Sequence, residues 1–241
     1  MKIIATIEAR MGSSRLPGKV FKEINRKPMI YYLVERLKRV KEIDEIVLAT
    51  TKNIEDNVLE NFAKESKISI FRGEENNVLK RVYDASFHHK ANVVIQLTGD
   101  NPIIDIEILK KCLKIFKKRA PDSLNTIFSN SFPVGMFINI LSFEALQKSH
   151  EQATGIYREH VGLFIRDNLN LFDTLIIHAE PRMNRPDIVI TVDEIDDFNL
   201  VKKIFLHFKN REIKFSCVDL IDFFDQNPQL LSINKRVKRR F

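Results

Sequence analysis

The sequence predicts an α/β protein in which a mainly parallel β-sheet is flanked by helices. Within residues 1–118, short apolar runs alternate with longer stretches of helical periodicity, which is the pattern of βαβ units. The runs have the length and the Ile, Val and Leu content of buried parallel strands. A chain of 241 residues, 44% hydrophobic and 29% charged, is long enough for one generous domain with its own core. We therefore expect a single globular domain over residues 1–241.

The residue types in each run predict whether it is a strand or a helix. The expected strands cover residues 2–7, 45–50, 68–71 and 92–97. The expected helices, each with an apolar stripe, cover residues 28–39, 54–65, 77–88 and 105–118. Parallel sheets bind ligands beyond the carboxyl ends of their strands. The loops in which a site is expected therefore begin at Glu8, Thr51, Arg72 and Thr98.

The alternation breaks down after Pro121. Further strands are expected at residues 126–130, 136–141, 174–178, 188–192 and 214–217. Further helices are expected at residues 142–149, 156–167, 195–208 and 218–225. We interpret residues 121–170 as a segment inserted into the domain, where it covers a site or makes a dimer contact.

The net charge of +7 is concentrated at the C-terminus. The basic tail, residues 234–241, contains five Lys and Arg residues and no acid, and the rest of the chain is close to neutral. We expect a solvated, frayed tail, so that removing the residues after Ile233 leaves catalysis nearly intact. No aromatic interleaving or CxxC pair accompanies these charges, and no specific nucleic-acid partner is expected.

The remaining composition indicates a cytoplasmic protein. Cys112 and Cys217 are its only cysteines, which excludes a disulfide framework. No apolar run approaches the roughly 18 residues that a membrane span needs. The N-terminal run meets Glu8 and Arg10 too soon for a secretory signal.

Residues 9–19, directly after the first expected strand, combine two glycines, two serines and three cations. Glycines let the backbone come close to a ligand, and backbone amides and serine hydroxyls donate to phosphate oxygens. Arginine adds a planar fork of donors and lysine a point charge. The expected polyphosphate contacts are Ala9, Arg10, Gly12, Ser13, Ser14, Arg15 and Lys19. The loop is not a P-loop, because Val20 replaces the required Ser or Thr. The alternative is a glycine-rich turn with solvated charges.

The same residues carry a resemblance to a known family. Arg10–Lys19 followed by Lys27-Pro28-Met29 resembles the opening of cytidylyltransferases that activate acidic sugars. The resemblance is to the SpsF-like branch, which is related to the CMP-Kdo and CMP-sialate synthetases. Similar blocks follow in family order at residues 71–75, 97–102, 157–160 and 190–198.

This resemblance implies a Rossmann-like, nucleotide-diphosphosugar-transferase-like fold and commonly a homodimer. It implies transfer of CMP from CTP to a sugar or sugar phosphate, with Mg²⁺ and with release of pyrophosphate, for surface polysaccharide or glycan synthesis. Two other readings stay open. One is a sugar-1-phosphate nucleotidyltransferase that uses GTP or another NTP, and the other is a non-catalytic nucleotide- or sugar-binding homologue.

The resemblance also implies residue roles. Lys19, Arg10 and Asp100 are the expected catalytic residues. Further expected nucleotide contacts are Arg72, Gly73, Thr98 and Asp100. The expected substrate contacts are Asn101, Asn139, Arg158, Glu159 and His160.

Asp100 and Asp193 match the carboxylates that bind the metal in this family. Mg²⁺ prefers hard oxygen ligands and usually takes only one or two carboxylates. Each residue also has a structural alternative, because Asp100 is a possible turn former and Asp193 a possible cap of the following helix. For His160 the alternative is a helix residue that bonds a neighbouring carboxylate.

The sequence departs from the family at three positions. Relatives tend to place acids in the turn after the Pro133/Gly135 pair, whereas this chain has Phe137 and Asn139. Asn77 stands where relatives often carry Asp. The loss of charge near the expected acceptor pocket leaves the identity of the sugar open.

Overall fold

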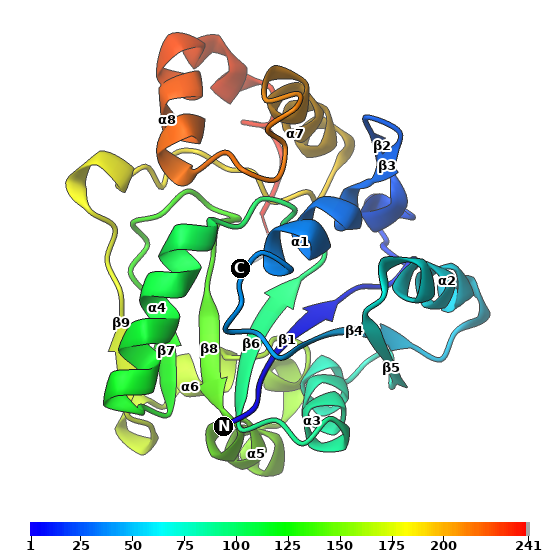
Figure 1. Ribbon diagram of the computed structural model, residues 1–241, viewed down its shortest axis with the longest axis vertical. Coiled ribbons are helices and arrows are strands. Elements are labelled where there is room, and N and C mark those ends of the chain that lie inside the picture. Colours follow the sequence, from blue (N-terminus) through cyan, green and yellow to red (C-terminus); the bar gives the residue numbers. More distant parts are fainter. Residues whose placement is uncertain (240–241) are drawn as a thin grey trace.

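The computed structural model describes residues 1–239, which form a seven-stranded sheet with helices on both faces (Figure 1). The strand order is β5-β4-β1-β6-β8-β7-β9. The strands are β1 (Ile3–Glu8), β4 (Glu45–Thr51), β5 (Ser69–Gly73), β6 (Val93–Thr98), β7 (Ser123–Asn125), β8 (Asn139–Ser142) and β9 (Thr174–Ile176). β8 is antiparallel to β6 and β7, and the other pairs are parallel. The expected mainly parallel sheet is confirmed.

The helices form two layers around this sheet. They are α1 (Met29–Leu37), α2 (Asn57–Ser66), α3 (Val78–His88), α4 (Ile106–Arg119), α5 (Phe143–Gln152), α6 (Leu163–Asp167), α7 (Ile195–His207) and α8 (Cys217–Gln226). α1, α2 and α4 pack on one face, and α3, α5 and α6 pack on the other. A small hairpin, β2 (Glu23–Ile24) and β3 (Lys27–Pro28), precedes α1.

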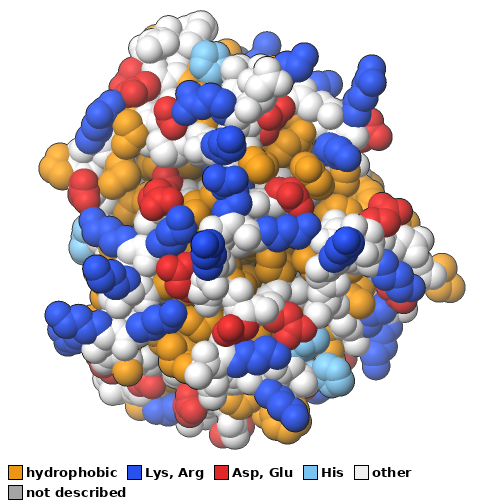
Figure 2. Space-filling model, viewed as in Figure 1, with side chains coloured by type: hydrophobic (Ala, Val, Ile, Leu, Met, Phe, Trp, Pro, Cys, Tyr) orange, Lys and Arg blue, Asp and Glu red, His pale blue; other side chains and the backbone are white. Residues whose placement is uncertain are grey.

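Alternation along the strands explains the two layers. Ile3, Ala5 and Ile7 of β1 pack toward α1, α2 and α4, whereas Ile4 packs toward α3 and α5. A third buried cluster joins α1 to α7 and α8 (Figure 1, orange to brown). No helix within residues 1–239 is long and apolar enough to cross a bilayer. In Figure 2, Lys and Arg side chains are interspersed with Asp and Glu on the visible face.

The expected elements of residues 1–118 are all present, within a few residues at their ends. Several expectations after Pro121 are wrong. Residues 126–130 form a turn rather than a strand, and residues 214–217 form no strand. Residues 188–192 make only the isolated bridge between Val134 and Val189, and their apolar side chains are buried against α7 and α8 instead.

The helix expected at residues 156–167 is also wrong as a single element. It is divided into the short turn η3 (Gly155–Arg158) and α6. Gly162 separates them with a backbone φ of +89°, a left-handed conformation that glycine adopts without strain. The surrounding residues 121–170 contribute β7 and β8 to the sheet and α5 and α6 to one of its faces.

The order in which strands are added to the sheet reverses at β1. After β1 the chain builds β4 and β5 on one side, and it then returns to place β6 on the other side. The carboxyl ends of β1 and β6 therefore lie at the switch point of the sheet, where open α/β sheets bind ligands.

Candidate active site

The 9–19 loop leaves β1 and is held by a buried carboxylate. Asp56 is fully buried and accepts a 2.7 Å hydrogen bond from the Met11 amide and another from the Thr51 hydroxyl. The Gly18 amide donates to the Met11 carbonyl at 2.9 Å and closes the loop, with a φ of +66° at Gly18. Within residues 1–239 no hydrogen bond occupies the amides of Gly12, Ser14 and Arg15. Such free donors suit the predicted binding of phosphate oxygens.

The loop after β6 lies directly beside the 9–19 loop. The Gly99 amide donates to the Glu8 carbonyl at 2.8 Å, and a Cβ at Gly99 would lie only 3.1 Å from that carbonyl and from the Ala9 Cβ. A larger residue at this position would crowd both neighbours. The Val192 amide donates to the Asp100 carbonyl at 2.9 Å, so the segment that carries Asp193 joins the same edge of the sheet.

These contacts bring one lysine between two carboxylates that are far apart in sequence. The Lys19 ammonium lies 2.7 Å from Asp100 Oδ2 and 3.2 Å from Asp193 Oδ1, and it also donates to the Val192 carbonyl. Arg15 Nη2 lies 2.8 Å from Asp193 Oδ1. All four side chains are only partly exposed, which strengthens their ion pairs relative to pairs in open solvent.

The neighbouring polar residues orient Asp100. The Thr98 hydroxyl donates to Asp100 Oδ1 at 2.6 Å, and Asn101 Nδ2 donates to the Thr98 hydroxyl at 2.8 Å. Asp100 therefore directs its other oxygen toward Lys19. Asn101 Oδ1 is buried without a hydrogen-bond partner among residues 1–239, so it remains a free acceptor beside the site.

The donor set fits Mg²⁺. Two carboxylates already share one positive charge, and no group of three or more His, Cys, Asp or Glu side chains gathers within residues 1–239. Mg²⁺ is typically held by one or two carboxylates together with phosphates and waters. The helix-cap alternative for Asp193 does not match the structure, because the N-cap of α7 is Glu194 and the carboxylate that accepts from its amide belongs to Asp197.

The expectation of a solvated, frayed tail is wrong for Asn234 and Arg239, whereas the side chains of Lys235, Arg236 and Lys238 are exposed as expected. Asn234 Nδ2 donates to Asp197 Oδ1 at 2.8 Å, and Arg239 Nη2 lies 2.6 Å from the same oxygen. The Lys238 carbonyl accepts a 3.2 Å bond from Arg15. The tail therefore contacts the site, and the expected indifference to its removal has lost its physical basis. Arg240 and Phe241 lie outside the described residues.

The other predicted nucleotide residues lie near the ends of β4 and β5. Arg10 Nη1 pairs with Glu75 at 3.0 Å on the surface. Arg72 donates to the carbonyls of Thr51 at 2.9 Å and Asn53 at 2.7 Å, so the structure places it as a support of the loop after β4. Gly73 is buried, and a Cβ there would lie 2.9 Å from the Arg81 side chain.

A polar chain crosses the sheet on the predicted acceptor side. Gln96 Nε2 donates to Glu8 Oε1 at 2.7 Å, and Asn139 Nδ2 donates to Gln96 Oε1 at 2.9 Å. Burial raises the pKa of Glu8 to about 7, against the opposing effects of its Gln96 hydrogen bond and of Arg81. Sequence reasoning missed Glu8 and Gln96, although both lie near the carboxyl ends of predicted strands.

The remaining predicted substrate residues lie on the segment that packs on Asn139 of this polar chain. Gly162 packs so closely on Asn139 that a Cβ would lie 2.9 Å from its Nδ2. Arg158, Glu159 and His160 precede Gly162 with exposed side chains, and the structure brings none of them to Lys19 within the described residues. Asn77 caps α3 by accepting from the Lys80 amide at 3.0 Å, which accounts for this departure because Asn caps as well as Asp.

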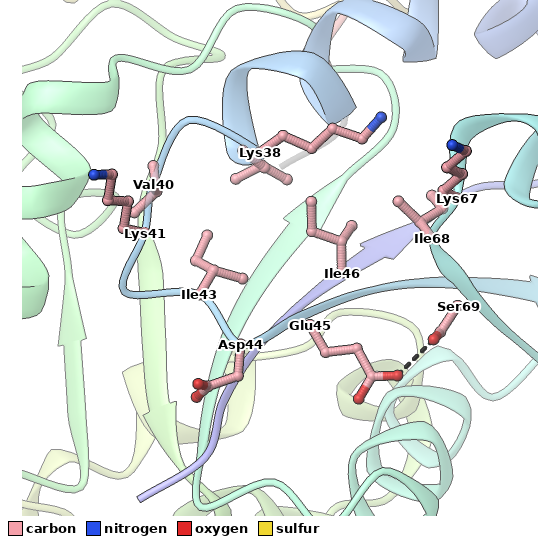
Figure 3. Close-up of a pocket in the computed structure, with 11 residues that line it drawn as sticks. Lys38, Val40, Lys41, Ile43, Asp44, Glu45, Ile46, Lys67, Ile68 and Ser69 are labelled. Atoms are coloured by element: carbon pink, nitrogen blue, oxygen red, sulfur yellow. Dashed lines mark hydrogen bonds between the residues drawn. The ribbon is translucent and has the colours of Figure 1, made fainter.

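A pocket of about 510 Å³ lies at the opposite end of the strands (Figure 3). Its polar lining includes Lys38, Lys41 and Lys67. Its two acids have structural partners, because Asp44 accepts from the Ile3 amide at 2.7 Å and Glu45 accepts from Ser69 at 2.5 Å. The pocket is therefore separate from the residues that carry the predicted chemistry.

Comparison with known proteins identifies the family of the chain. Residues 4–227 match the family model described as cytidylyltransferase. An uncharacterized protein of Methanocaldococcus jannaschii is 36% identical over 243 residues, which cover 100% of this chain and 97% of that protein. The spore coat polysaccharide biosynthesis protein SpsF of Bacillus subtilis is 30% identical over 233 residues, which cover 94% and 95% of the two chains.

A solved structure supports the same assignment. The structure of a cytidylyltransferase from Leptospira borgpetersenii superposes with a TM-score of 0.90 at 30% identity, covering 100% of this chain and 99% of that one. The resemblance of the motifs is confirmed, and the chain belongs to the cytidylyltransferase family.

Proposed function

We propose that this protein transfers CMP from CTP to a sugar acid and releases pyrophosphate. The observation that carries the proposal is the convergence of Arg15 and Lys19 on Asp100 and Asp193 at the switch point of the sheet. Family membership supports cytidylyl transfer as the reaction at that place.

The 9–19 loop would bind the triphosphate. Its free amides and its two serine hydroxyls offer hydrogen bonds to phosphate oxygens. Arg15 and Lys19 would exchange their carboxylate partners for phosphate oxygens when CTP binds. Lys19 then neutralises the negative charge that grows as pyrophosphate leaves, which is the main catalytic need in phosphoryl transfer.

Asp100 and Asp193 would hold Mg²⁺ once the cations have moved to the phosphates. The bound ion supplies further neutralisation of the triphosphate charge. Thr98 keeps Asp100 oriented through its 2.6 Å hydrogen bond, so one carboxylate of the pair is already in position. Metal and nucleotide should therefore bind cooperatively, because each removes a competitor of the other.

The acceptor would lie over the polar chain of Glu8, Gln96 and Asn139. Arg158 lies on the covering segment and offers positive charge to a sugar carboxylate, and His160 beside it offers a ring nitrogen for a hydrogen bond. Phe137 and Asn139 stand where the family resemblance implies acids, so less negative charge would oppose an anionic sugar. An oxygen of the acceptor attacks the α-phosphorus and displaces pyrophosphate in line.

Three further properties belong to this proposal. We place the protein in the cytoplasm and in surface polysaccharide or glycan synthesis. We also propose a homodimer, which the exposed apolar side chains of Ile156, Leu169, Leu171 and Ile176 support. These four side chains are 36–59% exposed and lie between residues 156 and 176.

Pyrophosphate release from each of the four NTPs, with a panel of sugar acids and sugar phosphates, tests the function. We expect release only with CTP and a sugar acid. Release with GTP and a sugar phosphate would favour a sugar-1-phosphate nucleotidyltransferase. Binding of CTP without release under any condition would make the protein a non-catalytic homologue.

A further inference from the structure

The chain returns to the candidate site after α8. The turn η6 (Pro228–Ser232) is followed by Asn234, which is only 6% exposed and donates to the Val189 carbonyl at 3.0 Å. From there the segment of residues 234–239, drawn in red in Figure 1, runs toward the sheet. Its contacts end at Asp197 and Asp193 on the first turn of α7 and just before it.

Asp197 connects this segment to the metal end of the site. Asp197 is fully buried, and its Oδ2 accepts from the amides of Asp193 at 3.0 Å and Glu194 at 2.9 Å. Its Oδ1 accepts from Asn234 at 2.8 Å and from Arg239 at 2.6 Å. The backbone position of Asp193 therefore depends on where this buried carboxylate is held.

Arg239 is the cation that balances Asp197. A buried carboxylate is costly unless an opposite charge pairs with it. The Arg239 guanidinium meets both oxygens of Asp197, at 2.6 Å and 3.1 Å, and its side chain is only 14% exposed. Arg239 Nη1 also lies 3.7 Å from Asp193 Oδ2, whereas Lys19 pairs with the other oxygen of that carboxylate, Oδ1.

The same segment supports the phosphate side. Arg15 donates to the Lys238 carbonyl at 3.2 Å and to Asp193 at 2.8 Å. One end of the chain thus contacts both the carboxylate that would bind metal and a cation that would bind phosphate.

We propose that Arg239 is a positioning residue of the site. Resting on the proposed function, it holds Asp197, and through Asp197 it holds Asp193 where that carboxylate shares one cation with Asp100. It contacts no reacting group. Residues that orient metal ligands in this way typically contribute 10–100-fold to metal affinity.

Full-length Arg239→Ala, Arg239→Lys and Arg236→Ala proteins test the proposal. Arg236 lies in the same tail with an exposed side chain, so its variant loses the same charge without touching Asp197. The readouts are Mn²⁺ binding in the presence of CTP, followed by electron paramagnetic resonance, and the Mg²⁺ concentration for half-maximal turnover. We expect Arg239→Ala to weaken both at least about tenfold. Arg239→Lys should recover part of the loss, and Arg236→Ala should match the wild type.

Thermal unfolding of each variant separates positioning from simple stability. A lower melting temperature for Arg239→Ala with unchanged Mn²⁺ and Mg²⁺ dependence would overturn the proposal, as would equal metal affinities for Arg239→Ala and Arg236→Ala. If Arg239→Ala does not fold, Arg239→Gln against Arg239→Lys decides, because only Lys keeps the charge. Failure of the proposed function would appear separately, as a wild-type protein that binds Mn²⁺ and CTP but releases no pyrophosphate.

Discussion

Lys19 donates a 2.7 Å hydrogen bond to Asp100, which lies 81 positions away in the sequence. The two residues come from the loops after β1 and β6, which meet only because the sheet places these strands side by side. A cation that is proposed to bind phosphate is thus paired with a carboxylate that is proposed to bind metal. Both must change partners when Mg²⁺ and CTP bind.

Loss of the Lys19 charge should slow catalysis strongly. Lys19→Ala is expected to cost about 2–4 kcal/mol of transition-state stabilisation, because the ammonium should interact most strongly with departing pyrophosphate. The measurement is kcat/KM for CTP by pyrophosphate release. Lys41→Ala is the control, since Lys41 lines the pocket at the opposite end of the sheet. Equal kcat/KM for Lys19→Ala and wild type would remove this residue from the mechanism.

The two carboxylates should act as one unit. Asp100→Asn and Asp193→Asn each keep the shape of the side chain but remove an anionic ligand, so each should raise the Mg²⁺ requirement and turn over slowly at saturation. The double variant should be little worse than either single one, because residues that act together are non-additive. Additive losses in a Mg²⁺ titration of the three proteins would argue for separate roles.

The partly buried Glu8 should make stability depend on pH. Burial raises its pKa to about 7, whereas an unfolded Glu titrates near about 4.3. Between these values the folded protein keeps a proton that the unfolded chain has released, so this residue lowers the free energy of unfolding as pH rises. Glu8→Gln should remove this pH dependence. Between pH 4 and pH 8 its free energy of unfolding should therefore rise by up to about 3 kcal/mol relative to that of the wild type.

Urea denaturation at pH 4 and pH 8 measures this effect. Gln96, Arg81 and Asp100 also influence the titration of Glu8, and all are retained in the variant. Glu23→Gln is a matched control, because Glu23 is exposed. A pH slope in Glu8→Gln identical to that of wild type would show that Glu8 titrates normally.

Arg36 should be one of the most costly side chains to remove. It is 1% exposed, its guanidinium donates to the carbonyls of Ile104, Glu212 and Phe215 at 2.8–2.9 Å, and it lies 4.1 Å from the Phe215 ring centroid. Arg36→Met leaves three carbonyls without this donor, for which we expect about 3 kcal/mol or more. Thermal or urea unfolding measures it, with exposed Arg39→Met as control. A loss as small as that of the control would contradict the role.

The hydrophobic periodicity of the sequence predicts the secondary structure correctly in some parts of the chain and not in others. Residues 1–118 are predictable because strand and helix periodicities alternate cleanly there, and the 9–19 loop stands out by its density of phosphate donors. Residues 188–192 have the alternation of a strand, yet they are buried by helices rather than paired in the sheet. Periodicity reports burial, and it does not report which element provides it.

The role of the tail could not be predicted from the local sequence pattern, for a different reason. Arg239 is one of several similar charges, and its position follows from the burial of Asp197, which exists only once α7 has packed. Asp100 and Asp193 could be predicted as site residues because both follow predicted strands. Asp197 and Arg239, which hold Asp193 in place, could not be predicted in this way.

The fate of the CTP α-phosphorus tests the central claim most directly. Followed by ³¹P NMR with Mg²⁺ and a sugar acid, it should move into a single new phosphodiester resonance as an equimolar amount of pyrophosphate appears. Wild-type protein that leaves CTP unchanged with every sugar acid, or that forms pyrophosphate and free CMP without a sugar adduct, would contradict cytidylyl transfer at this site.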